Sequence, residues 1–111
     1  MTGEGRRAKL YRGDTLLGGV VVAPEACDPP YFVGELAPSP AFDGVRPLFE
    51  RQADAVDRSF GEGAAAEQAE RESMRVQAEI LGPGLSVTWA HSSESVDVTG
   101  IDIRGTRVTW R

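Results

Sequence analysis

The spacing of the apolar residues changes twice along this chain, from strand-like to helical and back again. Residues 6–23 have the pattern of a strand pair, residues 39–81 that of helices, and residues 85–110 that of strands. Strands that are separated by a run of helices are typical of α+β folds. We therefore expect an α+β fold in which an antiparallel sheet of about five or six strands packs a helical pair on one face.

The length of the chain sets the number of domains. A chain of 111 residues is long enough for one hydrophobic core and too short for two independent ones. The sequence shows no internal repeat and no linker. We predict a single α+β domain over residues 1–111, with an N-terminal hairpin and short strand, a central helix pair and C-terminal strands.

Glycines define the first predicted hairpin. Gly13-Asp14 has glycine in the first position, which suits a two-residue type II′ turn and would place Leu10 opposite Leu17. Gly18-Gly19, in the middle of the second strand, predicts a bulge or the close approach of another backbone. A proline-rich segment follows, and within it residues 31–36 are expected to form a short strand.

The helical segment begins with a turn over residues 40–45. Apolar residues then recur at steps of three or four, and the main helix is predicted near residues 47–59, with Pro47 in its first turn. A second helix is predicted over residues 64–81, because Gly82-Pro83-Gly84 supplies the usual signals for a helix end.

The last part of the chain predicts a strand over residues 85–90, a polar loop and a second hairpin over 96–110. We place the hairpin turn at Arg104-Gly105, which sets Asp102 opposite Arg107 as a cross-strand ion pair. Gly100 is expected at a bulge. One face of this hairpin is apolar and carries Ile101, Ile103, Val108 and Trp110.

Residues with reactive side chains are scarce. The chain has one histidine, His91, one cysteine, Cys27, and one lysine, Lys9. A Cys–His nucleophilic pair is conceivable, but neither residue lies in a known catalytic motif. The spacings that bind zinc or calcium are also missing. We therefore predict no catalytic residue, no metal and no cofactor, and favour a non-enzymatic protein over an enzyme.

Charge and composition restrict the partners and the location. The net charge of −5 disfavours nucleic acid, which is usually bound by a basic surface, and fits a protein partner that is basic. A single cysteine cannot form an intramolecular disulfide, and no apolar run is long enough to span a membrane. We expect a cytoplasmic protein with no membrane and no nucleic acid among its partners.

Two groups of residues are candidates for the interaction surface. The first is aromatic and consists of Tyr31, Trp89 and Trp110. Trp110 is difficult to bury so close to the end of the sequence, and an exposed tryptophan would anchor an interface. The second is acidic and lies on one edge of the main helix, at Glu50, Asp54 and Asp57. A solvated face of mixed charge, which includes Arg51 and Arg58, is its ordinary interpretation.

Short motifs in the first half of the chain resemble those of a group of small uncharacterised bacterial proteins from high-GC genomes. The motifs are residues 10–18, residues 28–34 and residues 40–49, and the last hairpin resembles the group more loosely. This resemblance implies no activity, no cofactor and no site residue.

Three functions remain open at this point. The first is a non-enzymatic protein-interaction module, such as an accessory or immunity-type protein that masks its partner. The second is a small carboxylate-based hydrolase or ligand-binding domain, which would use Asp28, Glu35 and Asp43. The third is a structural subunit that associates with itself as a homo-oligomer.

Overall fold

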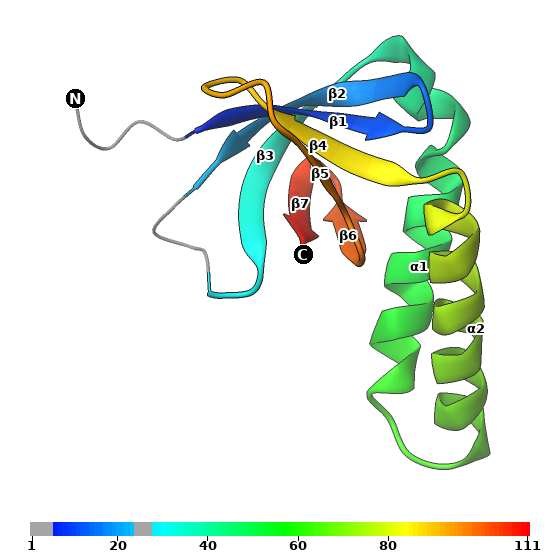
Figure 1. The fold of residues 1–111 in the computed structure, drawn as a ribbon. Helices are drawn as coiled ribbons and strands as arrows, with labels where there is room; N and C mark the ends of the chain where they lie inside the picture. Colours follow the sequence, from blue (N-terminus) through cyan, green and yellow to red (C-terminus); the bar gives the residue numbers. More distant parts are fainter. Residues whose placement is uncertain (1–5, 24–27) are drawn as a thin grey trace.

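The computed structural model describes residues 6–23 and 28–111, and it is an α+β fold as predicted (Figure 1). Its sheet has seven antiparallel strands, slightly more than expected. The elements in chain order are β1 (Arg7–Arg12), β2 (Thr15–Val22), β3 (Phe32–Pro38), the 3-10 helix η2 (Pro40–Gly44), α1 (Arg46–Ser59), α2 (Ala64–Leu81), β4 (Leu85–Trp89), β5 (Ser95–Asp97), β6 (Ile101–Arg104) and β7 (Arg107–Trp110).

The sheet curls until its two edges nearly meet. Its strand order is β5-β4-β1-β2-β3-β7-β6, so the edge strands β5 and β6 are joined in the chain by residues 98–100 alone. The N–H of Val98 donates to the carbonyl of Leu85 in β4 at 2.8 Å, and the next N–H, that of Thr99, donates to Arg111 beyond β7 at 2.7 Å. Two consecutive residues thus bond to opposite edges, and the sheet has the form of an almost closed barrel.

Alternate residues of each strand fill the interior. In β1 these are Ala8 and Leu10, while Arg7 and Lys9 point outward. The helices complete the core from one side with Phe42, Phe49, Val76 and Ile80. Burial of these apolar side chains is the main stabilising contribution in a domain of this size.

The helices α1 and α2 pack against each other and lie alongside β6. The side-chain amide of Gln77 in α2 bonds the backbone of Ile101 twice: its Oε1 accepts from the N–H at 2.8 Å, and its Nε2 donates to the carbonyl at 3.0 Å. An edge strand normally leaves such groups unpaired. Gln77 therefore takes the place of a neighbouring strand along this part of β6.

Two arginines of the sheet, Arg12 and Arg104, hold the helices to it at two further points. The guanidinium of Arg12 donates to the carbonyls of Glu79 and Ile80, both at 2.9 Å, and so satisfies carbonyls in the last turn of α2. Arg104 of β6 pairs with Asp57 of α1 at 2.8 Å. The hydrogen bond of Arg104 with Asp102, and to a smaller extent that with Asp57, raises the pKa of Arg104 above its usual value. The far end of the helical pair extends beyond the strands (Figure 1).

The first hairpin confirms the predicted turn and corrects the register. Gly13 has a φ of 60°, whereas Asp14, the second turn residue, does not have a positive φ. A positive φ at the first turn position alone is what a type II′ turn requires. Leu10 faces Gly18 instead of Leu17, because Leu17 is an extra residue in a bulge. The close backbone approach that we expected at Gly18-Gly19 does occur, where Gly18 lies against β3.

The register of the last hairpin was predicted wrongly. Arg104 faces Arg107, so the turn is Gly105-Thr106, and Asp102 faces Thr109. The predicted Asp102–Arg107 pair does not form. Gly105 has a φ of 62° and takes the first turn position, the same position that Gly13 takes in the first hairpin. The error shifts the pairing by two residues, so the same side chains still face the interior: Ile101, Ile103, Val108 and Trp110.

The segment before this hairpin also differs from the prediction. Residues 96–103 do not form one strand, because β5 pairs with β4 while β6 pairs with β7 at the opposite edge. Gly100 does lie at a bulge, because the N–H groups of Thr99 and Gly100 both donate to the carbonyl of Arg111, at 2.7 and 3.3 Å, so that two residues oppose one. Among the described residues, no helix is long and apolar enough to cross a membrane.

The contact between Gln77 and Ile101 can be tested by its effect on stability. We expect Gln77→Ala to lower the free energy of unfolding by about 1–3 kcal/mol, because it removes two hydrogen bonds and leaves two backbone groups of β6 without partners. Gln68→Ala, on an exposed position of the same helix, should change it by less than about 0.5 kcal/mol. Urea unfolding measures both values, and equal values would contradict this role for Gln77.

Candidate functional site

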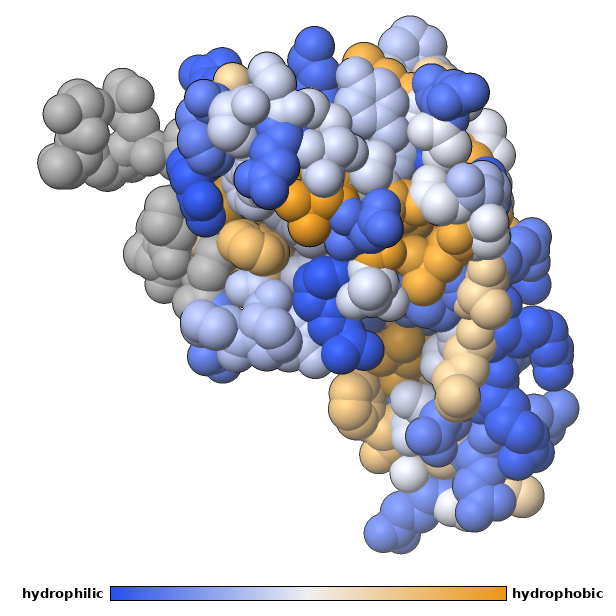
Figure 2. Space-filling model, in the orientation of Figure 1, coloured by the Kyte–Doolittle hydropathy of each residue, from blue (hydrophilic) through white to orange (hydrophobic). Residues whose placement is uncertain are grey.

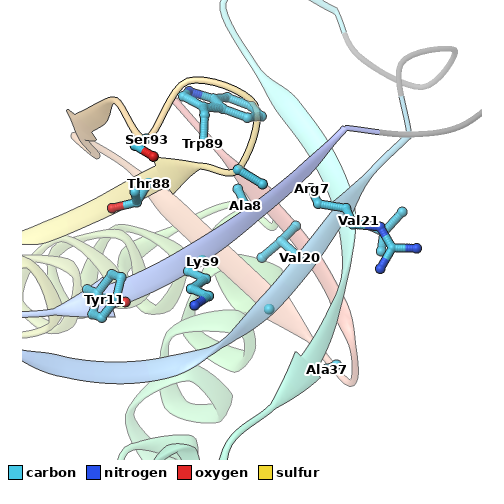
Figure 3. Close-up of a pocket in the computed structure, with 12 residues that line it drawn as sticks. Arg7, Ala8, Lys9, Tyr11, Val20, Val21, Ala37, Thr88, Trp89 and Ser93 are labelled. Atoms are coloured by element: carbon cyan, nitrogen blue, oxygen red, sulfur yellow. The ribbon is translucent and has the colours of Figure 1, made fainter.

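A hollow of about 580 Å³ lies on the exposed face of the sheet, over strands β4, β1, β2 and β3 (Figure 3). We call it the sheet hollow. It also reaches the loop after β4. The side chains that give it its chemistry are those of Arg7, Lys9, Tyr11, Val21, Thr88 and Ser93.

Small residues in the middle of the sheet produce this hollow. Thr88, Lys9, Gly19 and Ala37 are paired in one row across the four strands. Gly19 has no side chain and Ala37 has only a methyl group, so the surface sinks beside Lys9. A Cβ atom built on Gly19 would meet only the carbonyl oxygen of Ala8, at 4.0 Å, so the space above Gly19 is open.

Strand β1 supplies the charge of the sheet hollow. Arg7, Lys9 and Tyr11 alternate along β1 and therefore point to the same side of the sheet, as Figure 3 shows. Arg7 and Lys9 are exposed, and neither makes an ion pair within the described part of the chain. Among the described residues, those that line the hollow include no aspartate and no glutamate.

The nearest carboxylate in β3 has a partner elsewhere. Glu35 faces Val21 across the β2–β3 pair, but its carboxylate accepts a hydrogen bond from the hydroxyl of Thr106, on the side of β7. Within residues 6–23 and 28–111, the two cations of β1 therefore have no carboxylate neighbour in the sheet hollow.

Negative charge is concentrated on the helical segment. Residues 40–81 carry nine carboxylates and five arginines. The described strand segments, 6–23, 28–39 and 82–111, carry six carboxylates and seven basic side chains. The acidic net charge is therefore no guide to the charge of the sheet hollow, which is basic.

The chemistry of the sheet hollow suits binding. Tyr11, Thr88 and Ser93 offer hydroxyl groups, but the described part of its lining includes no histidine, cysteine or carboxylate that could act as a base. Val21 is 45% exposed and adds an apolar contact next to the cations. The arrangement can hold a ligand that combines negative charge with an apolar part.

The structure places the predicted tryptophans inside the molecule. Trp110 is 4% exposed and Trp89 is 7% exposed, so the expectation that Trp110 is difficult to bury was wrong. Phe32 lies opposite Trp110 in the β3–β7 pair and stacks on it with 5.3 Å between ring centroids, and it meets the ring of Trp89 edge-on at 5.6 Å. These rings fill one end of the barrel. The guanidinium carbon of Arg6 lies 4.5 Å from the ring centroid of Trp89.

Tyr31, the third predicted aromatic residue, is accessible. It is 44% exposed and lies just before β3, with the guanidinium of Arg111 at 5.8 Å from its ring centroid. It is not part of the sheet hollow. A role for Tyr31 in an interface stays a prediction.

The predicted acidic edge of α1 is largely engaged in ion pairs. Asp54 pairs with Arg58 at 2.9 Å, and Asp57 pairs with Arg104 at 2.8 Å. Glu50 is exposed and makes no ion pair within the described residues. Asp54 thus pairs within α1, while Asp57 connects α1 to β6, and a role of this edge in binding stays a prediction.

The carboxylates considered for a hydrolase do not converge. Asp28 lies before β3, where it bridges to Tyr31, and Asp43 lies after β3 in η2, where it pairs with Arg46. The length of β3 separates Asp28 from Asp43 by roughly 20 Å at about 3.3 Å per residue. The described residues include no group of three or more side chains suited to a metal ion.

The structure describes only the histidine of the candidate Cys–His pair. His91 is exposed and its ring contacts that of Trp89 at 5.9 Å between centroids. Cys27 lies outside the described residues. The structure therefore does not test the Cys27–His91 pair.

A second hollow, of about 400 Å³, lies between α2 and the residues Thr99 and Arg111. Gln52 lines it and is buried, and its Oε1 has no hydrogen-bond partner among the residues that the structure describes. Gln77 also lines it, but both ends of its amide are already bonded to Ile101. The sheet hollow offers more unpaired functional groups and is the stronger candidate.

Comparisons of the chain with models of protein families, with curated proteins and with solved structures gave no match. The resemblance to small bacterial proteins therefore stays a prediction. The assignment of the site depends on its geometry.

The sequence carried a signal for the sheet hollow that our sequence analysis missed. Arg7, Lys9 and Tyr11 alternate with the buried residues Ala8 and Leu10, so their common orientation follows from the strand pattern alone. The position of the hollow depends in addition on Gly19, and on the pairing of β1 with β4 and of β2 with β3, which no local pattern gives.

The burial of Trp110 can be tested against the exposure of Tyr31. We expect Trp110→Ala to lower the free energy of unfolding by about 3–5 kcal/mol, because it leaves a large cavity beside Phe32 and Trp89. Tyr31→Ala should cost less than about 1 kcal/mol, since much of its ring already contacts solvent. Chemical unfolding followed by circular dichroism compares them, and a small effect at Trp110 would mean that its ring is not part of the core.

Proposed function

We propose that this protein is a non-enzymatic protein-interaction module and that the sheet hollow binds its partner. The observation that supports this proposal is one concave site that combines Arg7 and Lys9, which form no ion pair with any residue that the structure describes, with the exposed apolar surface of Val21. A site of this kind contributes both apolar burial and charge complementarity to an interface.

The position of the sheet hollow supports this role. Strands β1 and β2 lie inside the sheet, and each is hydrogen-bonded on both sides. Their side chains are therefore held by a rigid backbone, and a partner does not have to order a loop in order to bind. An accessory or immunity-type protein of the bacterial cytoplasm, which masks a surface of its partner, fits these properties.

Self-association is a second candidate function, and one observation favours it. Phe60 is 82% exposed at the end of α1. An aromatic side chain in this position can serve as an anchor between two copies. Figure 2 shows apolar surface among the charged residues of the helical part, on the face that it displays.

The partner-binding role of the sheet hollow can be tested by filling it. We expect Gly19→Leu to fold normally, because the space above Gly19 is open, and to abolish binding by occupying the hollow. Tagged wild-type protein and variant would be used in parallel to capture partners, with quantification by mass spectrometry. Val96→Leu, at an exposed position in β5 outside the sheet hollow, is the control.

The capture experiment has two decisive outcomes. A protein that binds the wild type and Val96→Leu but not Gly19→Leu supports the proposal. If every captured protein binds Gly19→Leu as well as the wild type, the sheet hollow is not the partner-binding surface.

If the protein associates with itself, its average molecular mass in solution should rise with protein concentration. If Phe60 anchors two copies, sedimentation equilibrium should show dimers of the wild type at high concentration. Phe60→Ser should associate at least tenfold more weakly, because roughly this loss of affinity follows from the removal of one hot-spot residue. Met74→Ser, at an exposed position on α2, should associate as the wild type does. A wild-type protein that stays monomeric at all concentrations excludes this function.

A further inference from the structure

We infer that the sheet hollow recognises an extended acidic segment of the partner protein, with carboxylates at alternate positions followed by an apolar residue. This inference rests on the proposed function and specifies the chemistry of the ligand. It also reverses the partner charge expected from the sequence, because the surface in question is basic while the acidic residues are concentrated on the helices.

The spacing of the cations supports an extended ligand. Arg7 and Lys9 are two residues apart in a strand, so their Cα atoms are separated by about 6.6 Å. In an extended peptide, residues that point to the same side have the same separation. Two alternate carboxylates of one peptide can therefore meet both cations at once.

The third position along β1 favours an apolar residue. Tyr11 continues the row after Lys9 and pairs with Leu16 of β2, which is half-buried, so an aromatic and an apolar side chain adjoin at this position. The second carboxylate, beside Lys9, lies over the row of Gly19 and Ala37, and a side chain two residues beyond it would lie over Tyr11 and Leu16. The matching ligand has the pattern Glu-x-Glu-x-apolar, in which x points away from the sheet.

The hydroxyl groups at the rim can complete the contact. Thr88 and Ser93 line the hollow on the β4 side, next to the row of β1. Their hydroxyls can donate hydrogen bonds to a carboxylate or to a backbone carbonyl of the ligand. Charge-assisted bonds of this type are stronger than those between neutral groups.

The charge distribution disfavours a nucleic acid as the ligand. A long polyanion would extend past the sheet hollow, and the helical segment of this protein carries nine carboxylates. The hollow itself offers two cations, while nucleic-acid affinity depends on many phosphate contacts. A short acidic segment can bind the two cations without approaching the helices.

The test uses a fluorescein-labelled peptide of nine residues that contains Glu-Thr-Glu-Thr-Val. Fluorescence anisotropy would measure its binding to the wild type and to Arg7→Glu/Lys9→Glu. The matched control is Arg51→Glu/Arg75→Glu, which changes the net charge equally at exposed positions on the helices. All variants should remain folded, because none of the four side chains makes an ion pair in the described part of the chain.

We expect the β1 double variant to bind the peptide at least tenfold more weakly and the helix double variant to bind within about threefold of the wild type. Arg7→Gln/Lys9→Gln, which removes the charges without reversing them, should also weaken binding. The same peptide with glutamine in place of glutamate should bind poorly, and added salt should reduce the affinity of the glutamate peptide.

Several results would overturn the inference. Equal losses in the two charge-reversed variants would show that only net charge matters, and equal affinity for the glutamate and glutamine peptides would remove the role of the carboxylates. Tighter binding of a single-stranded oligonucleotide or of inorganic phosphate, lost in the β1 variant, would assign a different anion to the site. If Gly19→Leu loses a captured partner while the wild type does not bind the peptide, the proposed function stands and this ligand class is wrong.

Discussion

The backbone hydrogen bonds of Val98 and Thr99 determine the form of the whole molecule. These neighbouring residues bond to β4 and to Arg111 beyond β7, which belong to opposite halves of the sheet. The sheet must curl for both bonds to form, and the curl encloses the alternate apolar residues of every strand. One end of the enclosed space is filled by the rings of Phe32, Trp89 and Trp110, and the helices close another side.

The same curl decides what the outer surface presents. Because the interior takes one set of alternate residues, the other set faces solvent along every strand. On β1 this outer set is Arg7, Lys9 and Tyr11, and the missing side chain of Gly19 turns the convex face into a hollow beside them. Three carboxylates of the helices, Asp54, Glu72 and Asp57, pair with Arg58 and Arg104, away from the basic site.

Local signals in the sequence predicted the elements well. The helix over residues 64–81 has the predicted bounds, and the turn at Gly13-Asp14 has the predicted form. Both depend on residues that are close in the chain, such as the glycines and proline that end α2. The buried face of the last hairpin was also predicted correctly although its register was wrong, because a shift by two residues leaves each side chain on the same face.

The failures of prediction concern contacts between distant residues. The segment 96–103 looks continuous in sequence, and its division between two edges of the sheet depends on where β4 and β7 lie. The burial of Trp110 depends on Phe32 and Trp89, which come from two other strands. The sheet hollow combines residues from four strands, so its outward-facing cations could be predicted from alternation in β1 but its concave form could not.

The double hydrogen bond between Gln77 and Ile101 has a consequence for behaviour at high concentration. An open strand edge is a template on which another molecule can add a strand, and repeated addition leads to fibres. At Ile101 that template is occupied by a side chain of the same molecule. The helical pair thus protects the apolar start of β6 from intermolecular pairing, and local detachment of α2 would expose it before the rest of the fold is lost.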